Sequence, residues 1–135
     1  MNEMNKSIED ILLSIETNKQ TIADMLKTAK KDNIVISTKM QHYAATHSCL
    51  DMAQMTAYAD YARAYDSIKG LYGDADNTLV VEKIAGIHNT GLAYSLLNEM
   101  HTKQLTLMEQ ICSVLEKAAG AIKMLGRETA AVPSY

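Results

Sequence analysis

The sequence of 135 residues contains no phenylalanine and no tryptophan, and it has only one proline and six glycines. Folds rich in β-strands need many tight turns, and such turns draw on proline and glycine, so the composition disfavours a β-rich architecture. A core without phenylalanine or tryptophan has to be filled by leucine, isoleucine, valine, methionine and alanine. With 47% hydrophobic and 21% charged residues, the chain has the composition of an ordered globular protein rather than a disordered one.

Positive charge is also scarce, because the formal net charge is −3. A nucleic-acid-binding protein normally carries a basic excess or a basic stripe. The only basic cluster, Lys27, Lys30 and Lys31, is interpreted as the last turn of a helix, where cations are favourable to the helix dipole. Two cysteines, Cys49 and Cys112, are too few for a disulfide scaffold and are expected to be reduced core residues. We therefore expect no nucleic-acid partner.

Signals for membranes and secretion are missing as well. No apolar run follows a basic start at the N-terminus, and no stretch approaches the roughly 18 apolar residues that span a bilayer. The predicted polar helix faces are not enriched in lysine or arginine, as those of a helix lying on a membrane would be. The sequence therefore predicts a cytoplasmic protein without a membrane partner, and it leaves export by a signal-independent system open.

Helical periodicity dominates the first half of the chain. Isoleucines recur every seven residues from Ile8 to Ile22 and predict a helix over residues 7–31, which ends at Asp32–Asn33. Residues 33–38 are interpreted as an apolar connector or as the first turn of the next helix. A second helix is predicted from Ser37 or Thr38 to residue 71. It is poor in charge nearly all round, which is typical of a central helix or one covered by a partner.

A third helix is predicted over residues 79–125, after a turn rich in glycine and aspartate at residues 70–77. Its core stripe is predicted to run through Ile84, Gly91, Asn98, Leu105, Cys112 and Ala119, with a second apolar edge through Leu96, Met100, Leu107, Ile111, Val114, Ala118 and Leu125. Gly86 and Gly91 weaken the helix. Because the heptad phase continues across them, we predict one bent helix. The alternative is a short helix over 78–88 followed by a long helix from about residue 91.

The predicted fold class is all-α, an elongated antiparallel bundle of three helices, or of four if the third one breaks. We expect a single helical domain over residues 1–126 and a flexible tail over residues 127–135. Three helices of unequal length leave part of the longest uncovered. A second chain would bury that overhang, so we expect the bundle to be completed by homo-oligomerisation, as a dimer or a larger assembly.

Motifs that carry chemistry are missing. The sequence has no Glu-x-x-His, no two histidines four residues apart, no Gly-x-Ser-x-Gly and no phosphate-binding loop. His47 and Asp51, four residues apart, are the one pair that a helix would present together as metal ligands. Our preferred interpretation is a half-buried histidine paired to an aspartate. We therefore expect no catalytic residues, no metal and no cofactor.

Three polar residues fall at positions where a heptad pattern places the core. They are Asn18, Asn98 and His101. One interpretation is a buried polar layer, which can determine the register and oligomeric state of a bundle. The other is a seam that drifts around the helix, because the natural helix period is 3.6 rather than 3.5, so that these residues face solvent. Both interpretations stay open at this point.

Five of the seven tyrosines lie in the second predicted helix or directly after it, and Tyr58, Tyr61 and Tyr65 share one face. Tyrosine suits surfaces that are dry at one end and wet at the other. We therefore predict a partner interface, with core packing as the alternative. The interface consists of Met55, Tyr58, Tyr61, Tyr65 and Tyr72.

The resulting functional hypothesis is a non-catalytic helical interaction protein that acts through a homo-oligomeric bundle and binds another protein as well. Adaptors, regulators, chaperone-like partners and assembly subunits belong to this class. The alternative hypothesis is a bundle that binds a metal or small ligand between its helices through His47, Asp51 and His101.

Overall fold

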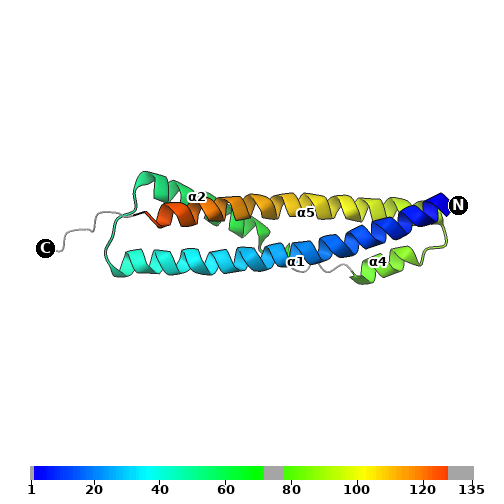
Figure 1. Cartoon of the computed structure of the whole chain (residues 1–135), viewed down its shortest axis with the longest axis horizontal. Helices are drawn as coiled ribbons and strands as arrows, with labels where there is room; N and C mark the ends of the chain where they lie inside the picture. Colours follow the sequence, from blue (N-terminus) through cyan, green and yellow to red (C-terminus); the bar gives the residue numbers. More distant parts are fainter. Residues whose placement is uncertain (1, 72–77, 128–135) are drawn as a thin grey trace. The chain divides into compact units, whose positions relative to one another are not determined.

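The computed structural model describes the backbone of residues 2–71 and 78–127. Within these residues the protein is all-α, as predicted, with helices α1 (Asn2–Ala45), α2 (Met52–Ile68), α4 (Thr78–Ala85) and α5 (Thr90–Leu125) (Figure 1). Most of the predicted tail, residues 128–135, and most of the predicted turn at 70–77 lie outside the described residues. The helix boundaries differ from the predicted ones at three places.

The first difference is that α1 continues through residues 32–38, so the predicted helix end at Asp32–Asn33 is wrong. The reason is packing: the stripe that begins with Ile8 continues every seven residues, and its members Ile15, Ile22, Ala29, Ile36 and Tyr43 are all buried. Burial of an apolar stripe outweighs the modest helix preference of the β-branched residues at 34–36. Lys27, Lys30 and Lys31 consequently lie in the middle of α1, and their interpretation as a last helical turn is wrong.

The second difference is a turn where one helix was predicted to run from residue 37 or 38 to residue 71. After α1 ends, His47 adopts a left-handed conformation with φ of 53°. The amide of Ser48 donates to the carbonyl oxygen of Tyr43 over 3.1 Å, and that of His47 to Ala44 over 3.4 Å. These two bonds form a Schellman motif, which terminates α1.

A capping box then starts α2. The side chain of Asp51 accepts from the amide of Gln54 over 2.8 Å, while the Gln54 side chain accepts from the amide of Asp51 over the same distance. The capping box thus provides partners for backbone groups at the start of α2 that the helix itself leaves unpaired. His47 and Asp51 do not share a helix face, because one residue lies in the turn and the other is the N-cap.

The third difference lies at residues 86–89, which separate α4 from α5. The single bent helix that we predicted is wrong, and the alternative of a short and a long helix is right. Asn89 is the physical reason, because its side-chain oxygen accepts from the amide of Leu92 over 3.0 Å and its carbonyl from that of Ala93 over 2.9 Å. An asparagine that satisfies the first amides of a helix is a strong start signal.

This break also shifts the core register of α5 by one residue. Leu105, on the predicted core stripe, is 43% exposed, and Cys112 is exposed as well. The buried stripe is instead Leu97, Gln104, Ile111, Ala118 and Leu125, flanked by Ala93, Val114 and Ala121. Ile84 does face a core, but the phase that it sets ends with α4. The second apolar edge of the prediction contained part of the true stripe.

The helices form two compact units. Unit 1 comprises the described residues of 1–24 and 70–110. Its core is built by Ile15, Ile84, Ala93 and Leu97, with half-buried hydrophobic residues packed against them from α1, α4 and α5. Those residues are Ile8, Ile11, Leu12, Val81, Ile87, Leu96 and Met100. Three short apolar surfaces, one on each helix, are thereby removed from water.

Unit 2 comprises the described residues of 25–69 and 111–135. Here α1 and α5 advance toward the same end, whereas α2 runs back along them, so antiparallel packing holds for α2 but not for the α1–α5 pair (Figure 1). The buried residues from α1, α2 and α5 are Leu26, Ala29, Ile36, Tyr43, Gln54, Tyr61, Ile68, Ile111, Val114, Ala118, Ala121 and Leu125. No phenylalanine or tryptophan is needed because alanine and isoleucine let the helices pack closely.

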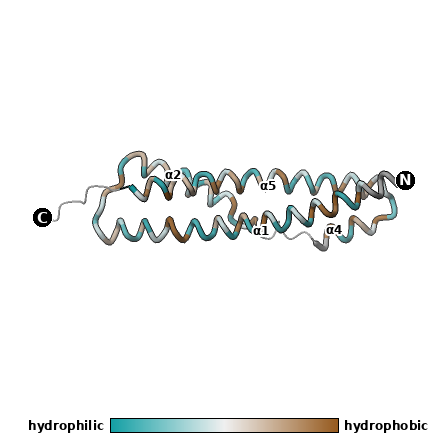
Figure 2. The backbone as a smooth tube through the Cα atoms, in the orientation of Figure 1, coloured by the Kyte–Doolittle hydropathy of each residue, from teal (hydrophilic) through white to brown (hydrophobic). Residues whose placement is uncertain are grey.

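Every helix has a polar as well as an apolar side. Figure 2 shows hydrophilic and hydrophobic positions mixed along α1 and α5 rather than gathered in one uniformly apolar stretch. Accordingly, no helix in the described part of the chain is long and apolar enough to cross a membrane.

The Schellman motif generates the first prediction. A left-handed conformation costs a non-glycine residue about 1 kcal/mol or more, whereas glycine adopts it freely. His47→Gly should therefore raise the free energy of unfolding by about 0.5–1 kcal/mol in urea denaturation. His42→Gly, the same change inside α1, is the matched control and should lower it by a similar amount. A loss of stability in His47→Gly would contradict the assigned role of His47.

Candidate functional site

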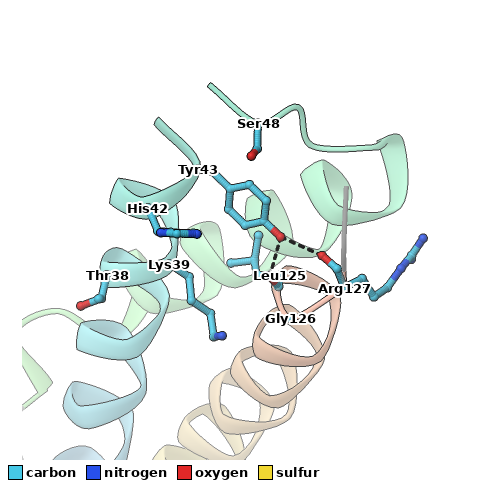
Figure 3. Close-up of a pocket in the computed structure, with 8 residues that line it drawn as sticks. All are labelled: Thr38, Lys39, His42, Tyr43, Ser48, Leu125, Gly126 and Arg127. Atoms are coloured by element: carbon cyan, nitrogen blue, oxygen red, sulfur yellow. Dashed lines mark hydrogen bonds between the residues drawn. The ribbon is translucent and has the colours of Figure 1, made fainter. Parts of the chain in front are cut away.

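The most polar part of unit 2 lies where the C-terminal ends of α1 and α5 meet the first turn of α2. Tyr43, the last residue of the α1 stripe, donates its hydroxyl to the carbonyl oxygen of Leu125 over 2.6 Å, and the carbonyl oxygen of Arg127 lies 3.0 Å away (Figure 3). The last carbonyls of a helix have no partner inside that helix. Tyr43 thus caps α5 from a neighbouring helix.

Gln54 completes this capping. Its side chain is fully buried, and its Nε2 donates to the carbonyl oxygen of Met124 over 2.8 Å and to the Tyr43 hydroxyl over 3.3 Å. Its Oε1 belongs to the capping box of α2. A buried amide is tolerated only when both ends are hydrogen-bonded, and here they are. This role of Gln54 was not predicted from the sequence.

Arg127 and Asp51 form an ion pair beside this junction, with 2.7 Å between Nη2 and Oδ2. Both side chains are more than two-fifths exposed, so the pair adds little stability. Asp51 therefore has two protein partners, the first turn of α2 and Arg127.

A hollow of about 600 Å³ opens next to the junction (Figure 3). It is lined by Thr38, Lys39, His42, Tyr43, Ser48, Leu125, Gly126 and Arg127. Three of these are basic and none is acidic. Two helices end here, and cations are favourable near the negative ends of helix dipoles. The basic character of the hollow is thereby explained by the fold itself.

The hollow lacks the arrangement that nucleophilic catalysis needs. A serine nucleophile requires a base within hydrogen-bonding distance. The Ser48 hydroxyl pairs instead with the Thr46 hydroxyl over 2.9 Å, and His42 lies edge-on to the ring of Tyr43. Among residues 2–71 and 78–127, no hydrogen bond joins His42 to Ser48. The hollow can hold an anionic or polar group, but it has no activated nucleophile in the described part of the chain.

The residues considered for metal binding are not brought together. His47 is exposed on the turn, Asp51 is engaged in the capping box and the ion pair, and His101 is half-buried in unit 1. Nowhere in the described residues do three or more histidine, cysteine, aspartate or glutamate side chains gather as a metal site would require. Cys49 and Cys112 are exposed free thiols, so their expected place in the core is wrong.

A buried polar contact does form in unit 1, with different members from those predicted. Asn18 donates its Nδ2 to Gln104 Oε1 over 3.3 Å, and Gln104 Nε2 donates to the carbonyl oxygen of Ile15 over 3.1 Å. Gln104 is buried. Asn98 and His101 are half-buried and make no side-chain hydrogen bond within the described residues. The one-residue shift in register buries Gln104 in place of Leu105, and neither Asn98 nor His101 belongs to this contact.

The predicted tyrosine interface is split by the structure. Tyr61 is only 2% exposed, and its hydroxyl donates to Asn33 Oδ1 over 2.6 Å, so Tyr61 is a core residue and its assignment to an interface is wrong. Tyr58 and Tyr65 are half-buried, Met55 is exposed, and Tyr72 lies outside the described residues. Burial raises the pKa of the Tyr61 phenol well above its usual value, and the charges of Tyr65 and Asp32 add to this.

No protein-family model, no curated protein and no solved structure matches this chain. The function therefore has to be inferred from the surface of the protein. Large apolar side chains are more than half exposed at Leu13 and Val80 in unit 1 (69% and 51%) and at Ile34, Met52 and Met55 in unit 2 (60%, 76% and 51%). Contiguous exposed apolar side chains mark interaction sites more often than single ones do.

The first two turns of α2 form such a contiguous surface. No charged residue occurs in residues 52–59, and the exposed side chains there are Met52, Ala53, Met55, Thr56 and Ala59. Met52, Met55 and Ala59 follow the i, i+3, i+7 spacing of one helix face. We call these five residues the α2 surface. Met55 is the only one of these five residues that was predicted at an interface. That prediction was based on the positions of the tyrosines and not on the lack of charged residues at 52–59.

The Gln54 network generates the second prediction. Gln54→Ala leaves the carbonyl of Met124 without its donor and removes half of the capping box. The free energy of unfolding should fall by about 2–3 kcal/mol, measured by urea denaturation. Gln41→Ala, at an exposed position of α1, is the matched control and should change it by less than about 0.5 kcal/mol. Equal effects of the two substitutions would show that the network adds no stability.

Tyr61 generates the third prediction. Its pKa is raised in the folded protein, so the folded state resists ionisation, and stability is lost as pH rises above the unfolded value of about 10. At pH 8, Tyr61→Phe should be less stable than the wild type by about 1 kcal/mol, because the hydrogen bond to Asn33 is gone. Above pH 10 the free energy of unfolding of the wild type falls by ~1.4 kcal/mol per pH unit because of this site, and that of Tyr61→Phe does not. The two proteins should therefore be equally stable near pH 11. Parallel stability curves would contradict the burial of this phenol.

Proposed function

We propose that this protein is a non-catalytic helical interaction protein that associates with copies of itself through the α2 surface. The observation that carries this proposal is the gap in charge over residues 52–59, where Met52 and Met55 are 76% and 51% exposed. Burial of such side chains against a partner is worth about 25 cal/mol per Å² of apolar area. Without a partner that buries Met52 and Met55, we would expect charged residues in these two exposed turns.

The chemistry of the α2 surface favours a second copy as the occupant. A two-fold interface brings the same patch of both chains face to face, so any net charge on it would meet itself. The α2 surface has none. Ala53, Thr56 and Ala59 are small enough to let two helices approach closely, and the two methionines adapt their shape to the facing chain. Tyr58, half-buried at the edge, adds a polar tip of the kind found at interface rims.

A non-catalytic role is supported by the basic hollow, whose Ser48 and His42 do not pair, and by the engaged state of Asp51. The two exposed thiols, Cys49 and Cys112, suit a reducing compartment such as the cytoplasm, because exposed free cysteines oxidise elsewhere. An adaptor, a regulator and an assembly subunit all fit these properties.

The fourth prediction tests the proposed self-association. Met52→Asp combined with Met55→Asp puts carboxylates into the contact, so the dissociation constant should rise by about tenfold or more. Sedimentation velocity over a wide range of protein concentration measures this change. High ionic strength is the right condition, because apolar contacts persist there while ion pairs are screened.

The matched control is Leu105→Asp, which makes the same kind of change at a leucine that is 43% exposed on α5 in unit 1. It should leave the dissociation constant unchanged. Circular dichroism should give the same helix content for all variants. A wild type that stays monomeric at every concentration, or a control as disruptive as the double variant, would overturn the proposal.

A further inference from the structure

The two parts of α1 carry opposite charge. Residues 2–24 contain five acidic residues against two lysines, whereas residues 25–45 contain four lysines against one aspartate. In unit 2 the exposed Lys27, Lys30 and Lys31 flank a hollow of about 290 Å³ with Ile34. Lys27 and Lys31 are four residues apart on the helix, and like charges at this spacing repel each other. Neither of them has an ion pair within the described residues, so this surface lacks a counter-charge.

Each unit has exposed residues on the side of α1 that faces away from its core, and more than one set of them follows a helix face. In unit 1 the exposed residues Glu9, Leu13, Glu16 and Gln20 form what we call the acidic stripe. In unit 2 the exposed residues Lys27, Lys31, Ile34 and Thr38 form the basic stripe. Both stripes have the spacing four, three, four, which follows one helix face. Each contains one aliphatic side chain that is at least 60% exposed.

We propose that the acidic stripe of one copy pairs antiparallel with the basic stripe of a second copy. One register pairs the two apolar side chains with each other and one acidic side chain with one basic side chain. The other two pairs combine a charged side chain with an uncharged polar one. In that register Leu13 faces Ile34, Glu16 faces Lys31, Gln20 faces Lys27 and Glu9 faces Thr38. Each copy has one acidic and one basic stripe, so it can offer either of them to another copy.

A parallel arrangement does not fit the same stripes. With the helices parallel, Glu9 would face Lys27, but Leu13 would face Lys31 and Glu16 would face Ile34. Two apolar side chains would then lie against charges, and two charges would lose water without gaining a partner. The order of apolar and charged residues within the stripes therefore selects the antiparallel arrangement, as charge patterns do between coiled-coil helices.

This contact is independent of the α2 surface, because it lies on α1. It also uses charged side chains, whereas the α2 surface has no charged side chain. Exposed ion pairs are individually weak, so Leu13 and Ile34 supply the burial while the charges set the direction. Salt screens exposed charges over about 10 Å at 0.1 M. The α1 contact should therefore weaken as salt is raised, whereas the α2 contact should not.

Disulfide trapping tests the direction. Leu13→Cys and Ile34→Cys are made in separate chains in which Cys49 and Cys112 are replaced by serine. The two chains are mixed and oxidised, and the expected product is a mixed disulfide dimer. Neither chain alone should form one, because in the proposed register position 13 lies opposite position 34 and not opposite another position 13. A disulfide dimer from either chain alone, or no mixed product, would overturn the proposal.

Charge exchange gives a second, quantitative test by sedimentation at low salt. Glu16→Lys and Lys31→Glu each place like charges opposite one another, so each should raise the dissociation constant about tenfold. The chain carrying both changes restores opposite charges and should return to within about twofold of its parent. A double variant as weak as the single ones would overturn the pairing.

Carrying out this series with Met52→Asp and Met55→Asp present removes any contribution from the α2 surface. A failure of the proposed function then leaves the result of this series unaffected. Conversely, a failure here leaves the sedimentation of the α2 variants at high salt unaffected.

Discussion

The organisation of this protein depends on a single stripe along α1, in which Ile15, Ile22, Ala29, Ile36 and Tyr43 are buried at intervals of seven residues. Both units draw on it for part of their cores. Because burial is confined to this one side, the opposite side of the helix stays exposed and is free to vary in charge. The same constraint thus explains why α1 remains helical through its β-branched residues and why it has a surface available for partners.

Three polar residues lie within or at the end of the buried stripes. Tyr43 ends the α1 stripe, and its hydroxyl meets the unpaired carbonyls at the end of α5. Gln54 and Gln104 occupy positions in the stripes of α2 and α5, and both are buried with hydrogen bonds to the backbone of another helix. A glutamine in such a place disfavours other registers, since any slip would leave its amide unpaired at a cost of about 1–3 kcal/mol. These two residues therefore contribute to a unique arrangement as well as to stability.

Composition and period were enough to predict the all-α class. Register across breaks was not predictable, because a short capped loop such as the one ending at Asn89 resets the helix phase. The helix end predicted at Asp32–Asn33 was wrong. The prediction relied on these two residues as a local end of the helix and did not take into account that the apolar stripe of α1 continues on both sides of them. The role of Gln54 could not be predicted either, since its partner Met124 is 70 residues away in the chain.

The two proposed contacts differ in what they can discriminate. An uncharged surface such as that of α2 gains free energy from burial but tolerates several orientations, whereas the charged stripes of α1 add direction at little gain in affinity. Each contact uses only its own surface, so a dimer formed through the α2 surface leaves the α1 stripes free on both chains. A chain with both proposed contacts would therefore assemble beyond the dimer. Ionic strength would control the extent of assembly, because it weakens only the charged contact.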